Sequence, residues 1–230
     1  MNTNLKLSSR DHAMLMKTPF MSNLSSASAA RVMAAMTVTS LPARHLIFRD
    51  GETASSFFCV LSGYVRLYRL NREGREADLR ICGPGDTFAE CLLFGDRRYR
   101  YHAQTAESAT VAAFDLKAVR ALAEQERDVA AALLTMLSQH LLTTLDCVAN
   151  DRLHTAPQRV ANYILANCPV DGGPAAVRLP FQKSLLAGQL GLAPEALSRA
   201  FSKLREIGVT VRGRIIQVGD VQALRDVLRT

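Results

Sequence analysis

The sequence predicts an α+β fold in which a roll of short antiparallel strands is followed by one long helix and a small helical domain. Three observations favour this order. Residues 43–114 hold short β-branched and aromatic runs between glycine turns, residues 124–150 contain no Gly or Pro, and residues 183–205 have the apolar spacing of two short helices. Many short strands with closely spaced turns are typical of an antiparallel barrel or jelly roll. We therefore expect three segments, spanning residues 1–123, 124–150 and 151–230.

The first segment should open with two short amphipathic helices, over residues 9–17 and 25–36, because each begins at a Ser. The strands of the roll are expected at residues 46–48, 57–61, 65–70, 77–81 and 110–114. Glycine favours the positive φ values that tight turns require, and we expect it to do so at Gly51, Gly63, Gly74 and Gly85. The strand pattern alone also fits an all-β sandwich.

Residues 124–150 should form a helix about 40 Å long. Its apolar residues cover more than one face, so that one stripe can pack on the roll and a second can face a partner helix. We therefore expect a dimerisation helix with an interface at Val129, Leu133, Met136, His140, Leu141 and Thr144. The alternative is a helix that is buried wholly within one chain.

Residues 151–156 are expected to be a hinge, because Pro157 is suited to the first turn of a helix, which should run over residues 158–167. Residues 169–174 should form a loop. In residues 183–205 the two helices should meet at Gly191, with Ala187 where they pack closely. The inward-facing residues should be Leu186, Leu190, Leu192, Leu197 and Ala200. Residues 208–218 should form the hairpin wing of a winged helix-turn-helix, and a short helix should follow in residues 219–229.

This arrangement leaves Pro194, Glu195, Ser198 and Arg199 on the outer face of the second helix, near its N-terminus. Such a face can enter the major groove of DNA, where Arg suits guanine and Glu suits the amino group of cytosine. The uneven charge supports a polyanionic partner. Residues 151–230 contain 11 Lys and Arg against 6 Asp and Glu (+5), whereas residues 1–150 contain 17 against 15 (+2). The alternative is an ordinary pair of core-packing helices.

Five cysteines at scattered positions argue against a disulfide framework, and we expect Cys59, Cys82 and Cys91 to be buried as small apolar side chains. Charged residues interrupt residues 1–21, which therefore lack the apolar core of a signal peptide. We expect a cytoplasmic bacterial protein with no membrane partner.

The order of β-roll, long helix, hinge and winged helix-turn-helix resembles the Crp/Fnr superfamily of bacterial transcription regulators, over about residues 20–228. Two motifs carry the resemblance: Pro-Gly-Asp-Thr-Phe-Ala-Glu at residues 84–90 and Glu-Ala-Leu-Ser-Arg at residues 195–199. The resemblance implies a cyclic-nucleotide-binding-like roll and a homodimer that binds double-stranded DNA and RNA polymerase. It implies no catalytic residues and no enzyme activity. A cupin-like barrel enzyme is the alternative from another class, but residues 43–114 contain only two His, which lie far apart, and we expect no metal site.

The Glu-x-x-Ser-Arg motif resembles the Fnr-type reader of dyad-symmetric sites with TTGAT-like half-sites. By this resemblance Arg199 contacts guanine, Glu195 the base edges of the opposite strand, and Ser198 a neighbouring base. The expected phosphate contacts, which fix register without reading sequence, are Lys183, Ser202, Lys203, Arg212 and Arg214. Ala193 stands at the expected N-cap, where Ser or Thr would be usual, and Pro194 partly compensates.

The resemblance places an effector pocket at Glu90, Arg100 and Tyr101. Cyclic-nucleotide members have Gly-Glu and Arg-Ser where this chain has Ala89-Glu90 and Arg100-Tyr101. Because Ala crowds the backbone nest that a phosphate needs, a cyclic-nucleotide-responsive regulator is only the alternative here. We expect Glu90 and Arg100 to serve the structure instead, as a buried ion pair.

No Cys precedes Cys59, so no iron–sulfur cluster of the oxygen-sensing type is expected. Residues 88–94, with Tyr99 and residues 103–106, resemble the Dnr/NnrR branch, whose members respond to nitric oxide and control denitrification genes. Haem is the proposed sensor cofactor in that branch. The candidate axial ligands are His12, His45, His102, His140, His154 or a Cys, none of which lies in a haem-attachment motif.

Overall fold

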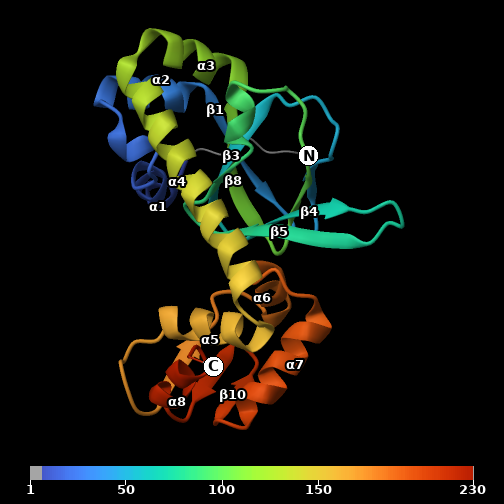
Figure 1. The fold of residues 1–230 in the computed structure, drawn as a ribbon. Helices are drawn as coiled ribbons and strands as arrows, with labels where there is room; N and C mark the ends of the chain where they lie inside the picture. Colours follow the sequence, from blue (N-terminus) through green and yellow to red (C-terminus); the bar gives the residue numbers. More distant parts are fainter. Residues whose placement is uncertain (1–6, 230) are drawn as a thin grey trace. The chain divides into compact units, whose positions relative to one another are not determined.

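The structure, a computed structural model, describes residues 7–229, so Thr230 and the first six residues of the expected 1–123 segment lie outside it. Contacts divide the chain into two compact units, residues 1–144 and 145–230. Antiparallel sheets, one long helix and a helix-turn-helix follow one another along the chain, which confirms the predicted α+β fold (Figure 1).

The N-terminal unit begins with α1 (Ser9–Met16), the 3-10 turn η1 (Met21–Asn23) and α2 (Ser26–Ala34). Two four-stranded sheets follow, and the strands pair antiparallel throughout. The first sheet has the order β1 (Met36–Leu41), β8 (Ala109–Asp115), β3 (Ser56–Ser62) and β6 (Thr87–Phe88). The second has the order β2 (Leu46–Phe48), β7 (His102–Thr105), β4 (Val65–Leu70) and β5 (Glu76–Cys82). In Figure 1, β4 and β5 form a long hairpin that projects from the roll.

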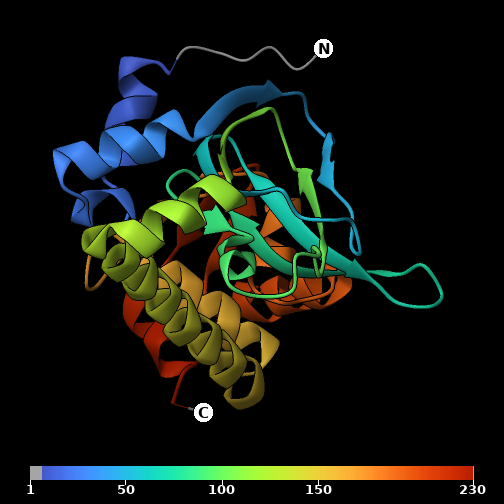
Figure 2. The same cartoon turned by 90° about the horizontal axis from the view of Figure 1, so that it is seen from above.

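All five predicted strands of the roll are present, whereas β1, β6 and β7 were not predicted. The expected helix over residues 25–36 ends at Ala34, and Met36 instead starts β1, which pairs with β8. In Figure 2, α2 lies beside α3 (Leu116–Gln125) at one edge of this unit. The four predicted turn glycines all have positive φ. Gly63 is the most restricted, because a Cβ there would lie 2.2 Å from the carbonyl oxygen of Ser108.

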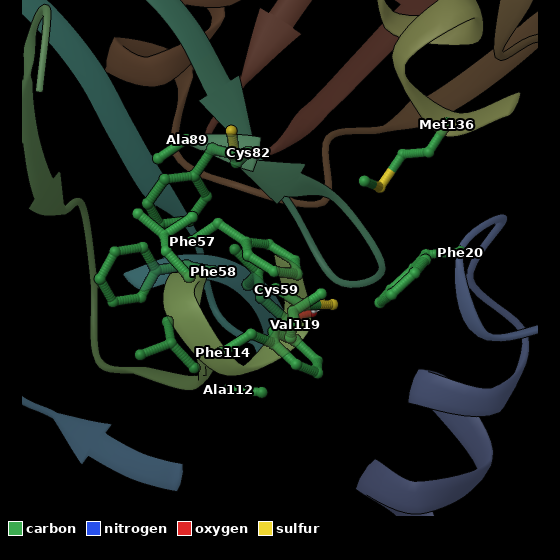
Figure 3. Close-up of a cluster of buried hydrophobic side chains, with 14 of the residues drawn as sticks. Phe20, Phe57, Phe58, Cys59, Cys82, Ala89, Ala112, Phe114, Val119 and Met136 are labelled. Atoms are coloured by element: carbon green, nitrogen blue, oxygen red, sulfur yellow. Dashed lines mark hydrogen bonds between the residues drawn. The ribbon is translucent and has the colours of Figure 1, made fainter. Parts of the chain in front are cut away.

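Aromatic side chains form the centre of the roll (Figure 3). The rings of Phe57 and Phe114 stack with centroids 4.7 Å apart, and Phe20 meets both of them edge-on. Cys59 and Cys82 are buried in this core as expected, but Cys91 is exposed, because it lies in the short turn η2 (Glu90–Leu93) rather than in a strand.

The long helix α4 spans Arg127–Leu153, three residues later at each end than predicted. Glu126 separates it from α3, because its backbone is extended (φ −114°, ψ 115°). The Asp128 carboxylate then accepts hydrogen bonds from the backbone of Ser25 and the hydroxyl of Ser28, which joins the start of α4 to α2. By length and composition alone α4 could cross a membrane, but its first half packs in the core of this unit.

The prediction of the dimer interface is wrong for Val129, Leu133 and Met136, which are buried within their own unit. These three side chains form the stripe of α4 that packs on the roll. The exposed apolar residues of α4 lie on other faces: Leu134, Leu141, Leu142, Leu145, Val148 and Leu153.

The C-terminal unit contains α5 (Ala156–Ala166), α6 (Lys183–Gln189), α7 (Pro194–Arg205) and α8 (Val221–Asp226). Its small sheet has the order β10 (Val209–Arg212), β11 (Ile215–Val218) and β9 (Ala175–Arg178). The β10–β11 hairpin is the predicted wing, and β9 adds a third strand that was not predicted. The hinge is narrower than the expected residues 151–156, because α4 continues through Leu153 and Thr155 already caps α5.

Candidate nucleic-acid interface and sensor site

The two helices of the expected helix-turn-helix are α6 and α7. Gly191 in the turn between them has φ +60°, and the amide of Leu192 donates to the Ala187 carbonyl at 2.9 Å. Of the predicted inward-facing residues Leu186, Leu197 and Ala200 are buried, as is Ala187 at the close approach, whereas Leu190 and Leu192 are half-buried. Ala193 is the N-cap of α7 and offers no side-chain hydrogen bond, and Pro194 is the first helical residue, as predicted.

The proposed base-reading residues Glu195, Ser198 and Arg199 are all exposed on α7. Their spacing of three and four residues places them on one face of the helix, opposite Leu197, Phe201 and Leu204, which are buried. Within residues 7–229 neither Glu195 nor Arg199 forms an ion pair with the rest of the chain. This face is therefore available to an external polar partner.

A groove of about 200 Å³ lies where α6 meets α7, and Ser198 lies at its border with the exposed face. Its lining comes from both helices: Lys183, Ser184, Ala187, Pro194, Leu197 and Ser198. The groove thus joins Lys183, one proposed phosphate contact, to Ser198, one proposed base contact.

The proposed phosphate contacts come from α6, α7 and the wing. Ser202, Lys203, Arg212 and Arg214 are exposed, whereas Lys183 is half-buried with its Nζ 4.7 Å from the centre of the Phe201 ring. The Ser202 hydroxyl donates to the Ser198 carbonyl at 3.1 Å, and the Arg214 guanidinium donates to the Pro180 carbonyl at 3.3 Å. The cationic side chains thus come from three elements: α6, α7 and the wing. Contacts from several elements can hold a helix in a fixed position on the phosphate backbone of a duplex.

In the N-terminal unit, Ala89 lies where cyclic-nucleotide-binding relatives were expected to have a glycine, and its backbone is left-handed (φ +66°). Its N–H donates to the hydroxyl oxygen of Tyr101 at 3.0 Å. Burial raises the pKa of Tyr101, so this side chain remains a neutral phenol. The backbone donor that an anionic ligand would use is therefore already occupied by the chain's own Tyr101.

The Glu90 carboxylate is buried, and its Oε1 lies 2.6 Å from His140 Nδ1 of α4. Its Oε2 is also buried and has no hydrogen-bond partner among the described residues. The expected Glu90–Arg100 ion pair is wrong: Arg100 has a side chain that is 63% exposed and pairs with Asp96 at 2.6 Å. Arg100 and Tyr101 both lie in the irregular segment before β7, where the Tyr101 hydroxyl reaches the backbone of Ala89 while the Arg100 side chain extends into solvent.

A second arginine, Arg80 of β5, was missed by the sequence analysis. Its guanidinium donates to Asp86 at 3.0 Å and to the Thr87 carbonyl at 3.3 Å. Burial lowers the pKa of Arg80, but the acidic side chains around it, which include Cys82, Asp86 and Glu90, outweigh this effect and raise it. The sequence signal that could have identified Arg80 is its place in a strand directly before Ile81 and Cys82, which are both buried.

The five histidines lie in different surroundings. His12 is exposed on α1, and His45 and His102 are half-buried, with the His102 ring stacked on Tyr68 at a centroid distance of 5.0 Å. His154 has a buried Nδ1 without a described partner, and within residues 7–229 only His140 has a carboxylate partner. Residues 7–229 contain no group of three His, Cys, Asp or Glu side chains that could hold a metal ion.

Comparison with known protein families matches residues 38–126 to the cyclic nucleotide-binding domain and residues 158–227 to the Crp-like helix-turn-helix domain. The chain belongs to the Crp/Fnr family. As a member of this family it is a DNA-binding transcription regulator with a cyclic-nucleotide-binding-like domain. The Crp/Fnr family consists of transcription regulators rather than enzymes, which disfavours the cupin-like alternative.

The nitrogen fixation regulation protein FixK of Rhizobium meliloti is a Crp/Fnr relative with 29% identity, and the match covers 78% of this chain and 81% of FixK. The solved structure of FixK2 from Bradyrhizobium japonicum shares 27% identity and has a TM-score of 0.69, over 84% of this chain and 96% of FixK2. The sensor domain of the transcriptional regulator DNR from Pseudomonas aeruginosa shares 30% identity and has a TM-score of 0.52. That match covers 59% of this chain and 91% of the DNR sensor domain.

Proposed function

We propose that this protein is a homodimeric regulator of the Fnr type that reads TTGAT-like half-sites through α7. The observation that carries the proposal is the exposed face formed by Glu195, Ser198 and Arg199, which has no ion-pair partner within residues 7–229. Arg199 is suited to a bidentate contact with guanine, and Glu195 is suited to accept from cytosine on the opposite strand. Ser198 lies between them on the same face and contacts a neighbouring base.

The phosphate contacts fix the position of α7 on the duplex. Lys183 precedes the reading helix, Lys203 and Ser202 lie in its C-terminal half, and Arg212 and Arg214 come from the wing. Contacts of this kind carry no sequence information, but they supply most of the salt-dependent affinity.

The homodimer forms along an exposed apolar stripe of α4, defined by Leu134, Leu141, Leu145 and Val148. These residues are 64%, 61%, 55% and 42% exposed. They recur at intervals of seven, four and three residues, which is the spacing of a two-stranded coiled coil. The stripe replaces the buried part of the predicted interface and keeps Leu141, with Thr144 exposed beside it. A two-fold dimer presents two copies of α7 to half-sites about 34 Å apart.

We further propose that the sensor unit controls DNA binding, that haem is its cofactor and that nitric oxide is its signal, as in the Dnr/NnrR branch. Of the five histidines, His140 would be best suited to hold the haem, because metal-bound imidazoles usually donate their second nitrogen to a carboxylate. Glu90 Oε1 lies 2.6 Å from His140 Nδ1, an arrangement that would leave His140 Nε2 to hold the group. The haem iron would supply the site where nitric oxide binds. Aromatic side chains fill the centre of the roll, whereas His140 is 24% exposed and would be accessible to the haem.

The cyclic-nucleotide alternative is disfavoured by three contacts. Tyr101 occupies the N–H of Ala89, His140 occupies one oxygen of Glu90, and Arg100 pairs with Asp96 outside the roll. Calorimetric titration of the full chain with cyclic AMP and cyclic GMP should accordingly show no binding heat.

Selection from a random duplex library tests the DNA proposal. We expect enrichment of two inverted TTGAT-like half-sites separated by four base pairs, and enrichment of an unrelated or asymmetric sequence would contradict it. Absorption spectra of protein purified without oxygen test the sensor proposal. A Soret band after haem addition should shift with nitric oxide in the wild type and be lost in His140→Ala but not in His12→Ala. The protein is expected to act in the cytoplasm, together with RNA polymerase.

A further inference from the structure

Arg159 is the fourth residue of α5, and its side chain donates hydrogen bonds to several groups outside this helix. Its side chain is only 16% exposed. One terminal nitrogen donates to the Asp151 carboxylate at 2.6 Å and to the Leu190 carbonyl at 3.2 Å. The other donates to the Asp151 carbonyl at 2.8 Å, and Nε donates to the His154 carbonyl at 3.2 Å.

These contacts join three parts of the C-terminal unit. Asp151 belongs to the last turn of α4, His154 to the short link before α5, and Leu190 to the turn of the helix-turn-helix. The last turn of α4 also lies against Gly191 in the turn of the helix-turn-helix, since a Cβ at Gly191 would lie 3.2 Å from the Asp151 carboxylate. The carbonyl at the end of α6 and the carboxylate at the end of α4 therefore share one guanidinium.

We propose that Arg159 is a positioning residue for DNA reading. It fixes the last turn of α4 to the turn between α6 and α7, so that these segments move as one body. This inference rests on the proposed function, because it makes α4 the element that aims the reading helix. The predicted hinge at residues 151–156 then does not bend freely, and reorientation of α7 has to originate further towards the N-terminus of α4.

The geometry requires arginine. A guanidinium offers five N–H donors in a fixed planar fork, and the contacts above use all three of its nitrogens. Lysine keeps the charge but cannot meet the Asp151 carboxylate and three carbonyls at once. Substitution by lysine therefore separates this role from general electrostatics.

Hydrogen exchange of the full-length protein without DNA tests the coupling directly. In Arg159→Gln and Arg159→Lys, the amides of residues 154–156 and 190–192 should exchange about tenfold faster or more, as expected on loss of charge-assisted hydrogen bonds. Arg225→Gln is the matched control, because Arg225 pairs with the fully exposed Asp171 in the same unit. Unchanged exchange in both Arg159 variants, or an equal increase in the control, would overturn the proposal.

Affinity for inverted half-sites separated by three, four or five base pairs tests the consequence for DNA reading. The wild type should prefer one spacing, and Arg159→Lys should reduce this preference by about tenfold while its affinity for a scrambled duplex changes little. A retained preference in Arg159→Lys would contradict the positioning role. If the wild type ignored all three duplexes while the exchange result held, the proposed half-sites would be wrong and the coupling by Arg159 would stand.

Discussion

The imidazole of His140 lies 2.6 Å from the buried carboxylate of Glu90, which joins α4 to the short turn η2 that follows β6. Ala89, the residue before Glu90, is held in turn by Tyr101. Residues 89 and 90, which belong to the segment that binds the ligand in cyclic-nucleotide members of the family, are thus linked to the proposed dimerisation helix α4 through the contact of Glu90 with His140. An effector that changes the surroundings of His140 would act directly on α4.

Removal of one partner of the His140–Glu90 pair should be more harmful than removal of both. His140→Leu leaves the Glu90 carboxylate buried and unpaired, which should lower the free energy of unfolding by about 1–3 kcal/mol. The double variant with Glu90→Leu should recover part of this loss, because no buried charge remains. Denaturant unfolding of the full-length protein measures both effects. His12→Leu, an exposed site on α1, is the control, and strictly additive losses at positions 90 and 140 would argue against the pair.

Asp128 should make stability depend on pH at the junction of α2 and α4. Hydrogen bonds from the Ser25 backbone and the Ser28 hydroxyl lower the pKa of Asp128 from its usual 3.8 to about 2. Because the folded pKa lies below the unfolded one, the stabilisation is fully present above pH 4 and is lost as the pH falls towards 2. The melting temperatures of wild type and Asp128→Asn should differ near pH 6 and converge near pH 2. Asp146→Asn, on an exposed part of the same helix, should show no such convergence.

The apolar stripe of α4 should carry the dimer. Leu141→Asp places a charge in the middle of the stripe, where a partner helix would have to desolvate it. Sedimentation equilibrium should show a shift from dimer to monomer, on the order of 100-fold in the dissociation constant, which corresponds to about 2.7 kcal/mol. Val170→Asp changes an exposed apolar residue in a loop and should leave the dimer intact. A dimer that persists in Leu141→Asp would place the interface elsewhere.

Substitutions of Lys203 and Arg199 should have different effects on DNA binding, because Lys203 is proposed to contact a phosphate and Arg199 a base. Lys203→Ala should weaken binding to specific and scrambled duplexes alike and reduce the slope of log affinity against log salt by about 1 for each copy. Its cause is the loss of one phosphate contact. Anisotropy titrations at several salt concentrations measure the slope, with Lys117→Ala on α3 as the control. Loss of sequence preference in Lys203→Ala would show that it contacts bases instead.

The elements of the roll that could be predicted from sequence are those with local signals. β4 was predicted to the residue, because β-branched and aromatic residues lie between Gly63 and Gly74. β6 and β7 have two and four residues, too few for alternation to be recognised, and neither has a continuous apolar run like that of the three-residue strand β2. The start of α4 was predicted too early, since residues 124–126 favour helix and the break at Glu126 depends on the contact of Asp128 with α2.

The composition of α4 predicted two apolar faces but not which one meets the roll, so buried Met136 and exposed Leu141 were assigned to the same interface. The exposed face of α7 was predicted well, because helical periodicity alone separates Glu195 and Arg199 from the buried Leu197. Glu90 lies 50 residues from His140 in the sequence, and no local pattern connects them. Arg159 likewise looked like an ordinary charge on a helix surface.

The most direct measurement is a fluorescence anisotropy titration of full-length protein with a TTGAT-N4-ATCAA duplex and its scrambled counterpart, for wild type and Arg199→Ala. The wild type should prefer the palindrome, in the effector state that permits binding, and Arg199→Ala should lose about 1–3 kcal/mol per half-site on it with little change on the scrambled duplex. Equal affinity of wild type and Arg199→Ala for both duplexes in every effector state would contradict the account.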